Sequence, residues 1–181
     1  MSMLKRTIVL WSVLALPGLA AAYTLQTLPG GYYKTGEGTR QKKVAFMKVN
    51  VYDITHSMKQ VPANTTREAI IDADVDKKFD WQMLRHVDEK RLSNALREAY
   101  KMNGYADDAR VEKMIQPFRG GLKKGEHVQI WYDAATQTTS LMTPHGRVTV
   151  PGRDFMKGTW SIWFGKIDQP DLTQSLMSDL R

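Results

Sequence analysis

The first 22 residues have the pattern of a secretory leader, which leaves 159 of the 181 residues to form the folded part of the chain. Lys5 and Arg6 provide a positive start, residues 7–16 are almost wholly apolar, and small alanines end the segment at Ala22. The apolar run is shorter than the roughly 20 residues that a bilayer span needs. We therefore expect residues 1–22 to be a signal peptide, cleaved after Ala22, with export to the periplasm. An uncleaved anchor or a buried N-terminal helix is the alternative.

The chain contains no cysteine, so the exported part must be stabilised by a hydrophobic core and not by disulfides. About 160 residues are enough for one domain with such a core, and we expect residues 23–181 to form it. The sequence offers no thiol nucleophile, no thiolate metal ligand and no cysteine for a lipid anchor. Because no later apolar run is long enough to cross a bilayer, we expect no stable membrane span after leader cleavage.

The basic charge of the chain is spread along its length. There are 26 Lys and Arg against 19 Asp and Glu, and two of the 26 lie in the leader, which leaves a net charge of +5. Such a surface can serve nucleic acid, anionic lipid or solubility alone. Export argues against nucleic acid, and the lysines occur only in short pairs such as Lys42 and Lys43. We interpret them mainly as a solvated surface.

The periodicity of the apolar residues predicts an α+β domain. Strand-like and helix-like segments follow one another with few β-α-β crossovers, which favours an antiparallel β-sheet with a layer of α-helices on one face. The expected strands are residues 32–35, 39–52, 79–86, 127–132, 138–142 and 148–150, and the expected helices are residues 65–74, 88–102, 107–116, 152–164 and 171–180.

Three of these segments carry more detailed expectations. The strand at 39–52 is unusually long, and its apolar positions change face near Phe46, which predicts a bulge or burial on both faces. The glycines within 36–38 are interpreted as a turn. The helix at 152–164 has large apolar residues on nearly every side and should be buried.

Residue patterns of several common enzyme sites are missing from the sequence. The four histidines, His56, His86, His127 and His145, show no metal-ligand spacing, so we expect no metal site. There is no Gly-x-Ser-x-Gly segment for a serine hydrolase, and no dinucleotide-binding or Walker fingerprint. We therefore expect no cofactor.

Arg40 is the most informative charged residue. It follows a glycine-rich segment and enters a strand whose later part is apolar. A guanidinium stays charged, so a buried one requires an anion, which is either a protein carboxylate or a ligand. A surface or salt-bridged arginine remains the alternative at this point.

The order of several segments resembles the chalcone isomerase-like family. The resemblance covers nearly all of residues 25–180, and its order and spacing carry more weight than any single motif. The segments are residues 36–40 (Gly-Glu-Gly-Thr-Arg), 44–52, 88–100, 151–155, 162–165 and 171–180. This resemblance implies an open-faced sandwich, in which an antiparallel sheet is covered by helices and a ligand cleft lies between the two layers.

What the resemblance implies about the site centres on Arg40. In the plant isomerases the matching arginine stabilises negative charge during an intramolecular Michael-type ring closure. In the non-catalytic fatty-acid-binding relatives it helps to hold a carboxylate. Both uses need a fixed cation in a largely apolar pocket. Positions matching Phe46, Met47 and Val49 line the cleft in the plant enzymes, and Arg85 is a candidate for a second cationic wall.

The sequence departs from the catalytic pattern of that family at two places. The plant enzymes have a threonine where Met47 falls, and methionine cannot polarise a ketone. Their catalytic tyrosine falls near Asp88, Glu89 and Lys90, none of which is a phenol. We therefore expect no true chalcone isomerase activity and assign no catalytic residue.

Three functional hypotheses follow. The first is a non-catalytic binding protein for a small, largely apolar anionic ligand such as a fatty acid, held by Arg40. The second is an isomerase or lyase for an enone-type substrate, with Glu89, Lys90 or Tyr100 transferring the proton. The third is a protein-interaction module of the cell envelope. Its surface would be the leucines of the last helix, Leu172, Leu176 and Leu180.

Overall fold

The computed structural model describes residues 25–105 and 108–181, so the expected leader lies outside the described residues. Within them the strands form one seven-stranded antiparallel sheet, in which each strand pairs with the next along the chain. The strands are β1 (Thr27–Leu28), β2 (Tyr32–Val44), β3 (Met47–Met58), β4 (Lys77–Met83), β5 (His127–Asp133), β6 (Thr138–Thr143) and β7 (Gly146–Pro151).

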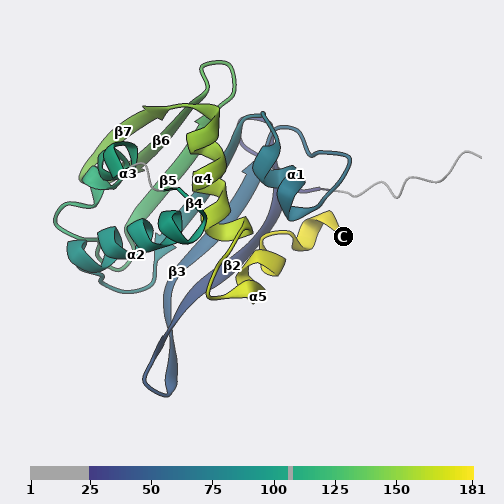
Figure 1. The fold of residues 1–181 in the computed structure, drawn as a ribbon. Coiled ribbons are helices and arrows are strands. Elements are labelled where there is room, and N and C mark those ends of the chain that lie inside the picture. Colours follow the sequence, from purple (N-terminus) through teal and green to yellow (C-terminus); the bar gives the residue numbers. More distant parts are fainter. Residues whose placement is uncertain (1–24, 106–107) are drawn as a thin grey trace, which may run out of the picture.

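Helices cover one face of the sheet, and the sheet curls around the helix α4 (Figure 1). The predicted α+β class, an antiparallel sheet with a helix layer, is therefore confirmed. None of the described helices combines the length and apolar character needed to cross a bilayer. The helical elements are α1 (Arg67–Asp72), α2 (Glu89–Met102), α3 (Asp108–Ile115), η1 (Gln116–Phe118), α4 (Arg153–Phe164), α5 (Pro170–Ser175) and η2 (Ser178–Leu180).

Most of α4 is buried, as its sequence predicted, because large apolar side chains occupy nearly every side of it. Its aromatic rings contact those of the central strand β4. The ring centroid of Phe79 lies 5.2 Å from that of Trp160 and 4.4 Å from that of Trp163. Rings packed at such separations contribute to stability beyond the area that they bury. The core therefore lies between α4 and the middle of the sheet.

Two predicted helix starts are close to the observed ones. Asp88 caps α2, with its Oδ1 accepting a hydrogen bond from the backbone N–H of Arg91 at 2.9 Å. At α1 the cap is Thr66, one residue later than the Thr65 of the expected capping box. The Thr66 hydroxyl accepts from the N–H of Ala69 at 3.2 Å.

The prediction of one long strand over residues 39–52 is wrong. The chain reverses at Ala45 and Phe46, and the structure has two strands, β2 and β3, joined as a hairpin with Val44 opposite Met47. Ala45 has a φ of 53°, a region that usually favours Gly or Asn, so the sequence carried no ordinary turn signal. The reversal also explains why the apolar positions change face near Phe46.

The outer part of this hairpin projects beyond the rest of the sheet (Figure 1). β3 pairs with β4 only from Tyr52 onward, so residues 41–50 pair only with each other. A bulge between Arg40 and Gln41 separates the projecting part from the part inside the sheet.

The prediction of a turn at residues 36–38 is also wrong, because these residues lie inside β2. The glycines instead allow the C-terminal segment to approach the strand closely. A Cβ at Gly36 would collide with the backbone oxygen of Ser175, and one at Gly38 would lie 2.8 Å from Cδ1 of Leu172. Any larger side chain at either position would push α5 away from the sheet.

The leucines of the last helical segment are buried. Leu172, Leu176 and Leu180 are 1%, 0% and 3% exposed, because α5 and η2 pack against β2 and the core. The predicted interaction surface on the last helix is therefore wrong, and the third functional hypothesis loses the residues on which it depended.

Candidate functional site

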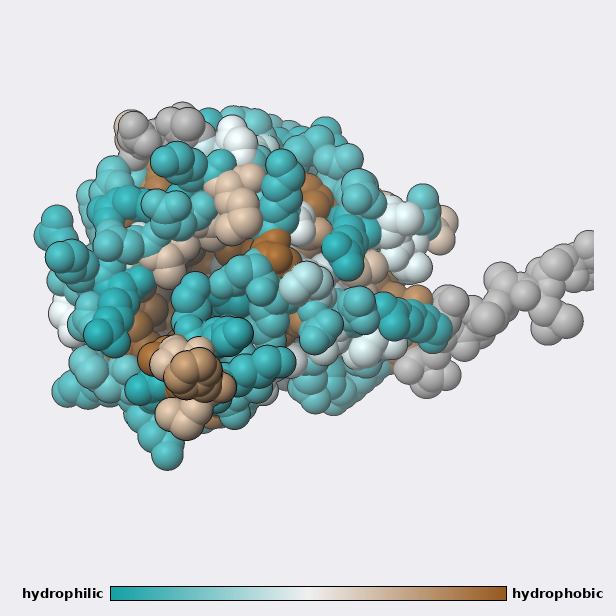
Figure 2. All heavy atoms as spheres, turned by 60° about the horizontal axis from the view of Figure 1, so that its bottom comes forward, coloured by the Kyte–Doolittle hydropathy of each residue, from teal (hydrophilic) through white to brown (hydrophobic). Residues whose placement is uncertain are grey.

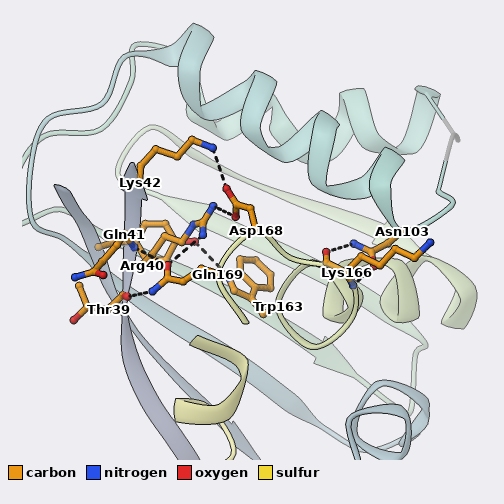
Figure 3. A network of polar contacts seen from close by, with 10 residues as sticks. Thr39, Arg40, Gln41, Lys42, Asn103, Trp163, Lys166, Asp168 and Gln169 are labelled. Atoms are coloured by element: carbon orange, nitrogen blue, oxygen red, sulfur yellow. Dashed lines mark hydrogen bonds and ion pairs between the residues drawn. The ribbon is translucent and has the colours of Figure 1, made fainter. Parts of the chain in front are cut away.

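A polar network joins β2 to the connection between α4 and α5. We call its four residues, Arg40, Lys42, Asp168 and Gln169, the Arg40 network (Figure 3). Arg40 Nη2 lies 2.6 Å from Asp168 Oδ1, and Lys42 Nζ lies 3.1 Å from Asp168 Oδ2. Arg40 Nη1 donates a hydrogen bond to Gln169 Oε1 at 3.2 Å. One carboxylate is thus held between two cations.

Gln169 fixes this arrangement by binding the free edge of β2. Its Oε1 accepts from the backbone N–H of Gln41 at 2.8 Å, and its Nε2 donates to the backbone oxygen of Thr39 at 3.0 Å (Figure 3). The side-chain amide thereby satisfies backbone groups that have no neighbouring strand. Asp168, the preceding residue, is placed beside Arg40 as a result.

The carboxyl group of Asp168 is ionised in this environment. Partial burial alone would raise its pKa, but the hydrogen bonds from Lys42 and Arg40 outweigh burial and lower the pKa below its ordinary value. Two full positive charges therefore face one negative charge, and the network keeps an excess positive charge.

A groove of about 360 Å³ opens beside the network, between the projecting hairpin and the start of α5. Three lysines and two aspartates line it, so its charge is also positive in balance. Arg40 is not part of the lining, since its guanidinium is bound to Asp168 and Gln169. The lining residues are Gln41, Lys42, Lys43, Lys48, Asp168, Gln169, Pro170 and Asp171.

Tyr52 is the phenol beside Arg40, and the sequence analysis did not single it out. The two residues are register partners across β2 and β3. The Tyr52 hydroxyl accepts a hydrogen bond from Trp163 Nε1 at 3.2 Å, and its ring stacks on Trp81 at 4.6 Å. Burial raises the pKa of Tyr52 although Arg40 lowers it, so the phenol is neutral. Aromatic side chains thus occupy the space between sheet and helices next to Arg40.

A second polar cluster lies further along β3, around the buried His56. Because an indole N–H can only donate, the Trp160 Nε1–H hydrogen bond of 2.9 Å makes His56 Nε2 an acceptor. Nδ1 then carries the proton and donates to Thr35 Oγ1 at 2.6 Å, and Thr35 donates to the backbone oxygen of Leu176 at 2.9 Å. Burial and the charge of Lys77 hold the pKa of His56 well below its ordinary value. His56 is a neutral core residue.

Lys77 completes what we call the His56 cluster (Thr35, His56, Lys77 and Trp160). Its ammonium group is fully buried and donates to the backbone oxygens of Ile70 and Ile71 at 2.8 and 3.0 Å, at the end of α1. It also lies 4.9 Å from the centroid of the Trp160 ring. Burial lowers the pKa of Lys77 to about 7. Within residues 25–105 and 108–181, His, Asp and Glu side chains form no group suited to a metal ion.

The structure does not bring the five predicted ligand-binding residues together. Arg40 is at the network, but Phe46 and Met47 are 101% and 70% exposed at the hairpin end. Val44, the partner of Met47, lies four positions after Arg40 in β2, which is about 13 Å of extended chain. Phe46 and Met47 therefore do not lie beside Arg40 in this structure, because the hairpin carries them away from the domain, and a role for them in ligand binding stays a prediction.

The other two predicted residues have different positions. Val49 is half-buried and pairs with Lys42, which lines the groove, but Val49 itself is not part of the lining. Arg85 is exposed, in the connection between β4 and α2, and forms no hydrogen bond or ion pair with the described residues. It is not part of the Arg40 network.

The candidate proton-transfer residues lie on α2, away from Arg40. Tyr100 is 1% exposed; its hydroxyl hydrogen-bonds with that of Thr159 at 2.8 Å, and burial raises its pKa. The Glu89 carboxylate accepts from the N–H of Gly120 at 2.9 Å, and Lys90 is exposed. None of the three belongs to the Arg40 network.

Comparison with known proteins identifies the family. The family model described as chalcone isomerase-like matches residues 33–177, which include the Arg40 network and the His56 cluster. The chain belongs to the chalcone isomerase-like family. The resemblance noted in the sequence is therefore confirmed.

The fold of this family member also resembles a solved structure, that of the Arabidopsis thaliana fatty-acid binding protein AtFAP1. The TM-score is 0.68 at 11% sequence identity, over 84% of this chain and 90% of that one. A search of curated proteins found no significant match. At this identity the likeness establishes a shared fold.

Proposed function

We propose that this chain is a non-catalytic binding protein for a small, largely apolar anionic ligand such as a fatty acid. The observation that carries the proposal is the Asp168 carboxylate, held by Arg40 and Lys42 with positive charge in excess. The Arg40 network therefore already binds a carboxylate, which is the group that such a ligand carries. The name of the structurally similar plant protein, a fatty-acid binding protein, supports the same class of ligand.

The ligand carboxylate competes with Asp168 for the same two cations. A charge-assisted hydrogen bond to a fixed guanidinium is among the stronger polar contacts in proteins. Asp168 is 46% exposed and lies on a connection between helices, so its side chain has room to yield the position. The apolar part of the ligand would contact Pro170, which lines the cationic groove, and Val49, the register partner of the groove-lining Lys42.

Two substitutions with opposite expected effects on fatty-acid affinity test this function. Arg40→Gln removes a cation and should lower affinity for a long-chain fatty acid, whereas Asp168→Asn removes the competing carboxylate and should raise it. Isothermal titration with oleate measures both, and native mass spectrometry of the gently purified protein shows whether an acid is retained. Arg97→Gln is a matched control, since Arg97 pairs with Glu112 on an exposed surface and neither residue lines the groove. Equal affinity in the wild type and the Arg40 variant would contradict the proposal.

An isomerase or lyase acting on an enone-type substrate is the second candidate, and one observation favours it. The neutral phenol of Tyr52 faces Arg40 across the strand pair, which places a proton donor beside a cation. A chalcone cyclisation assay separates the candidates. Acceleration over buffer that is lost in Tyr52→Phe supports catalysis, and the absence of acceleration removes the plant-type reaction.

We also propose export to the periplasm, on the strength of the leader pattern in residues 1–22. The test is fractionation of bacterial cells that express the chain, with N-terminal sequencing of the recovered protein. A mature N-terminus at Tyr23 in the periplasmic fraction is the expected result. A full-length chain retained elsewhere in the cell would contradict it.

A further inference from the structure

The end of the β2–β3 hairpin concentrates the apolar exposure of the molecule. We call residues 43–48 the hairpin tip. Val44, Phe46 and Met47 are 54%, 101% and 70% exposed, whereas the other exposed large apolar side chains of the described chain are only 39–43% exposed. Figure 2, which brings this end of the molecule forward, shows apolar atoms gathered at the end of the hairpin with hydrophilic atoms around them.

Two lysines flank these apolar side chains and face each other. Lys43 and Lys48 are direct register partners, and like charges in opposed positions destabilise a strand pair. Both side chains are exposed, and within residues 25–105 and 108–181 neither has an ion-pair partner. The tip therefore carries positive charge that the described chain does not neutralise.

The position of the tip allows it to reach a surface without disturbing the domain. Residues 41–50 pair only with each other, and the hairpin extends away from the sheet and the helix layer (Figure 1). An apolar end with basic residues directly behind it matches the layering of an anionic bilayer, in which acyl chains lie beneath negatively charged head groups.

We propose that the hairpin tip docks on an anionic lipid bilayer. Phe46 and the side chains of Val44 and Met47 enter the boundary between head groups and acyl chains, and Lys43 and Lys48 contact lipid phosphates. A second copy of this chain fits the tip less well, because a tip-to-tip contact would bring four lysines together. Charge complementarity thus favours lipid over self-association.

This docking does not depend on the proposed function, although two residues of the tip, Lys43 and Lys48, also line the cationic groove. Val44, Phe46 and Met47 do not line the cationic groove, so their substitution separates the two. If the docking proposal and the binding proposal both hold, docking places the groove at the bilayer surface, where a fatty acid can pass from the lipid to the groove.

A single label at the tip gives the most direct test, because the chain contains no cysteine of its own. Phe46→Cys in the full-length chain is labelled with the environment-sensitive dye nitrobenzoxadiazole. We expect a blue shift and brighter emission with vesicles of phosphatidylcholine and phosphatidylglycerol, and a smaller change with phosphatidylcholine alone. A label at Met102→Cys, on an exposed part of α2, is the control and should not respond.

Charge substitutions test the second half of the proposal. Lys43→Gln with Lys48→Gln should weaken binding to the mixed vesicles by about fivefold for each lysine, the value expected for one cation near an anionic surface. The pair Lys123→Gln and Lys124→Gln, also exposed, should leave binding unchanged. All variants have the same N-terminal segment, so any contribution of that segment is common to them.

Three outcomes would overturn the docking proposal. The first is an unchanged emission of the label at position 46 in the presence of mixed vesicles. The second is an equal response to vesicles with and without phosphatidylglycerol. The third is an emission shift that rises with protein concentration in the absence of lipid, accompanied by dimers in sedimentation velocity, which would assign the tip to a second copy of this chain. Fatty-acid affinity measured on the Phe46 variant reports separately on the groove, because Phe46 does not line it.

Discussion

The two ends of the β2–β3 strand pair differ in whether their polar and charged side chains have partners within the protein. At the His56 cluster, His56, Thr35 and Lys77 all find partners within the protein, and the aromatic core closes over them. At the Arg40 network and the hairpin tip, cations outnumber carboxylates, and Lys43 faces Lys48. The closed end therefore satisfies its polar groups within the protein, whereas the open end keeps an excess of positive charge.

The largest effect on stability should come from a substitution in the His56 cluster, at the closed end. Trp160→Ala removes a fully buried ring and leaves His56 Nε2 without its donor, so it should lower the free energy of unfolding by about 3–5 kcal/mol. Urea unfolding followed by circular dichroism measures this loss. Trp131→Ala is the control: Trp131 is half-buried beneath Arg147, and its loss should cost about 1 kcal/mol. Similar losses in the two variants would show that the His56 cluster is not a stabilising centre.

The next effect is a pH dependence at the same end. The pKa of Lys77 is about 7 in the folded protein against an ordinary 10.5, so between these values the unfolded chain binds more protons than the folded one. Stability therefore rises with pH over this window, by about 2 kcal/mol between pH 7 and pH 9. Lys77→Met should remove this rise. A wild-type stability that is flat or falling over the same range, relative to the methionine variant, would show that Lys77 remains protonated in the core.

A smaller effect on stability is expected at the open end. Asp168→Asn breaks ion pairs at a half-exposed carboxylate, which should cost about 1 kcal/mol or less. The same variant should bind oleate more tightly, since the competing carboxylate is gone. A thermal melt and a titration on one preparation distinguish this result from a structural role, in which stability falls sharply and affinity does not rise.

The smallest effect should be a gain in stability at the hairpin tip. Lys48→Glu converts a like-charge pair into an opposite-charge pair with Lys43, worth roughly 0.2–1 kcal/mol. Chemical denaturation compared with Lys124→Glu, an exposed lysine elsewhere, isolates this gain. Because the same change reverses a charge at the docking surface, vesicle binding should fall. A variant that is more stable and still binds anionic vesicles as well as wild type would break the link between unpaired charge and docking.

Periodicity predicted most of the fold because each helix and most strands have a local pattern. The Asp88 cap, the all-round apolar character of α4 and the strands after residue 127 needed no distant contact to be recognised. The β2–β3 hairpin was missed because Ala45 takes a positive φ without being Gly or Asn. Gly36 and Gly38 were assigned to a turn, although their role is to admit α5, which lies more than 130 residues later in the chain.

The candidate site was predictable only in part. Arg40 was identified because it follows a glycine-rich segment and enters a strand whose later part is apolar, and the family resemblance then implied its role. Asp168, Gln169 and Tyr52 were missed, and no local pattern marks them. Tyr52 becomes a neighbour of Arg40 only through the hairpin register, and Asp168 only through the path of the chain after α4.

Most of the elements, the α+β class and the family follow from the order of apolar periods and short segments along the chain. Which charges are neutralised depends on how the chain is folded in space. The fold paired Arg40 with Asp168, enclosed His56 and Lys77, and left Lys43 and Lys48 opposed at the end of a projecting hairpin. Electrostatic pairing depends on distance in space and on burial, and the local sequence pattern determines neither of these.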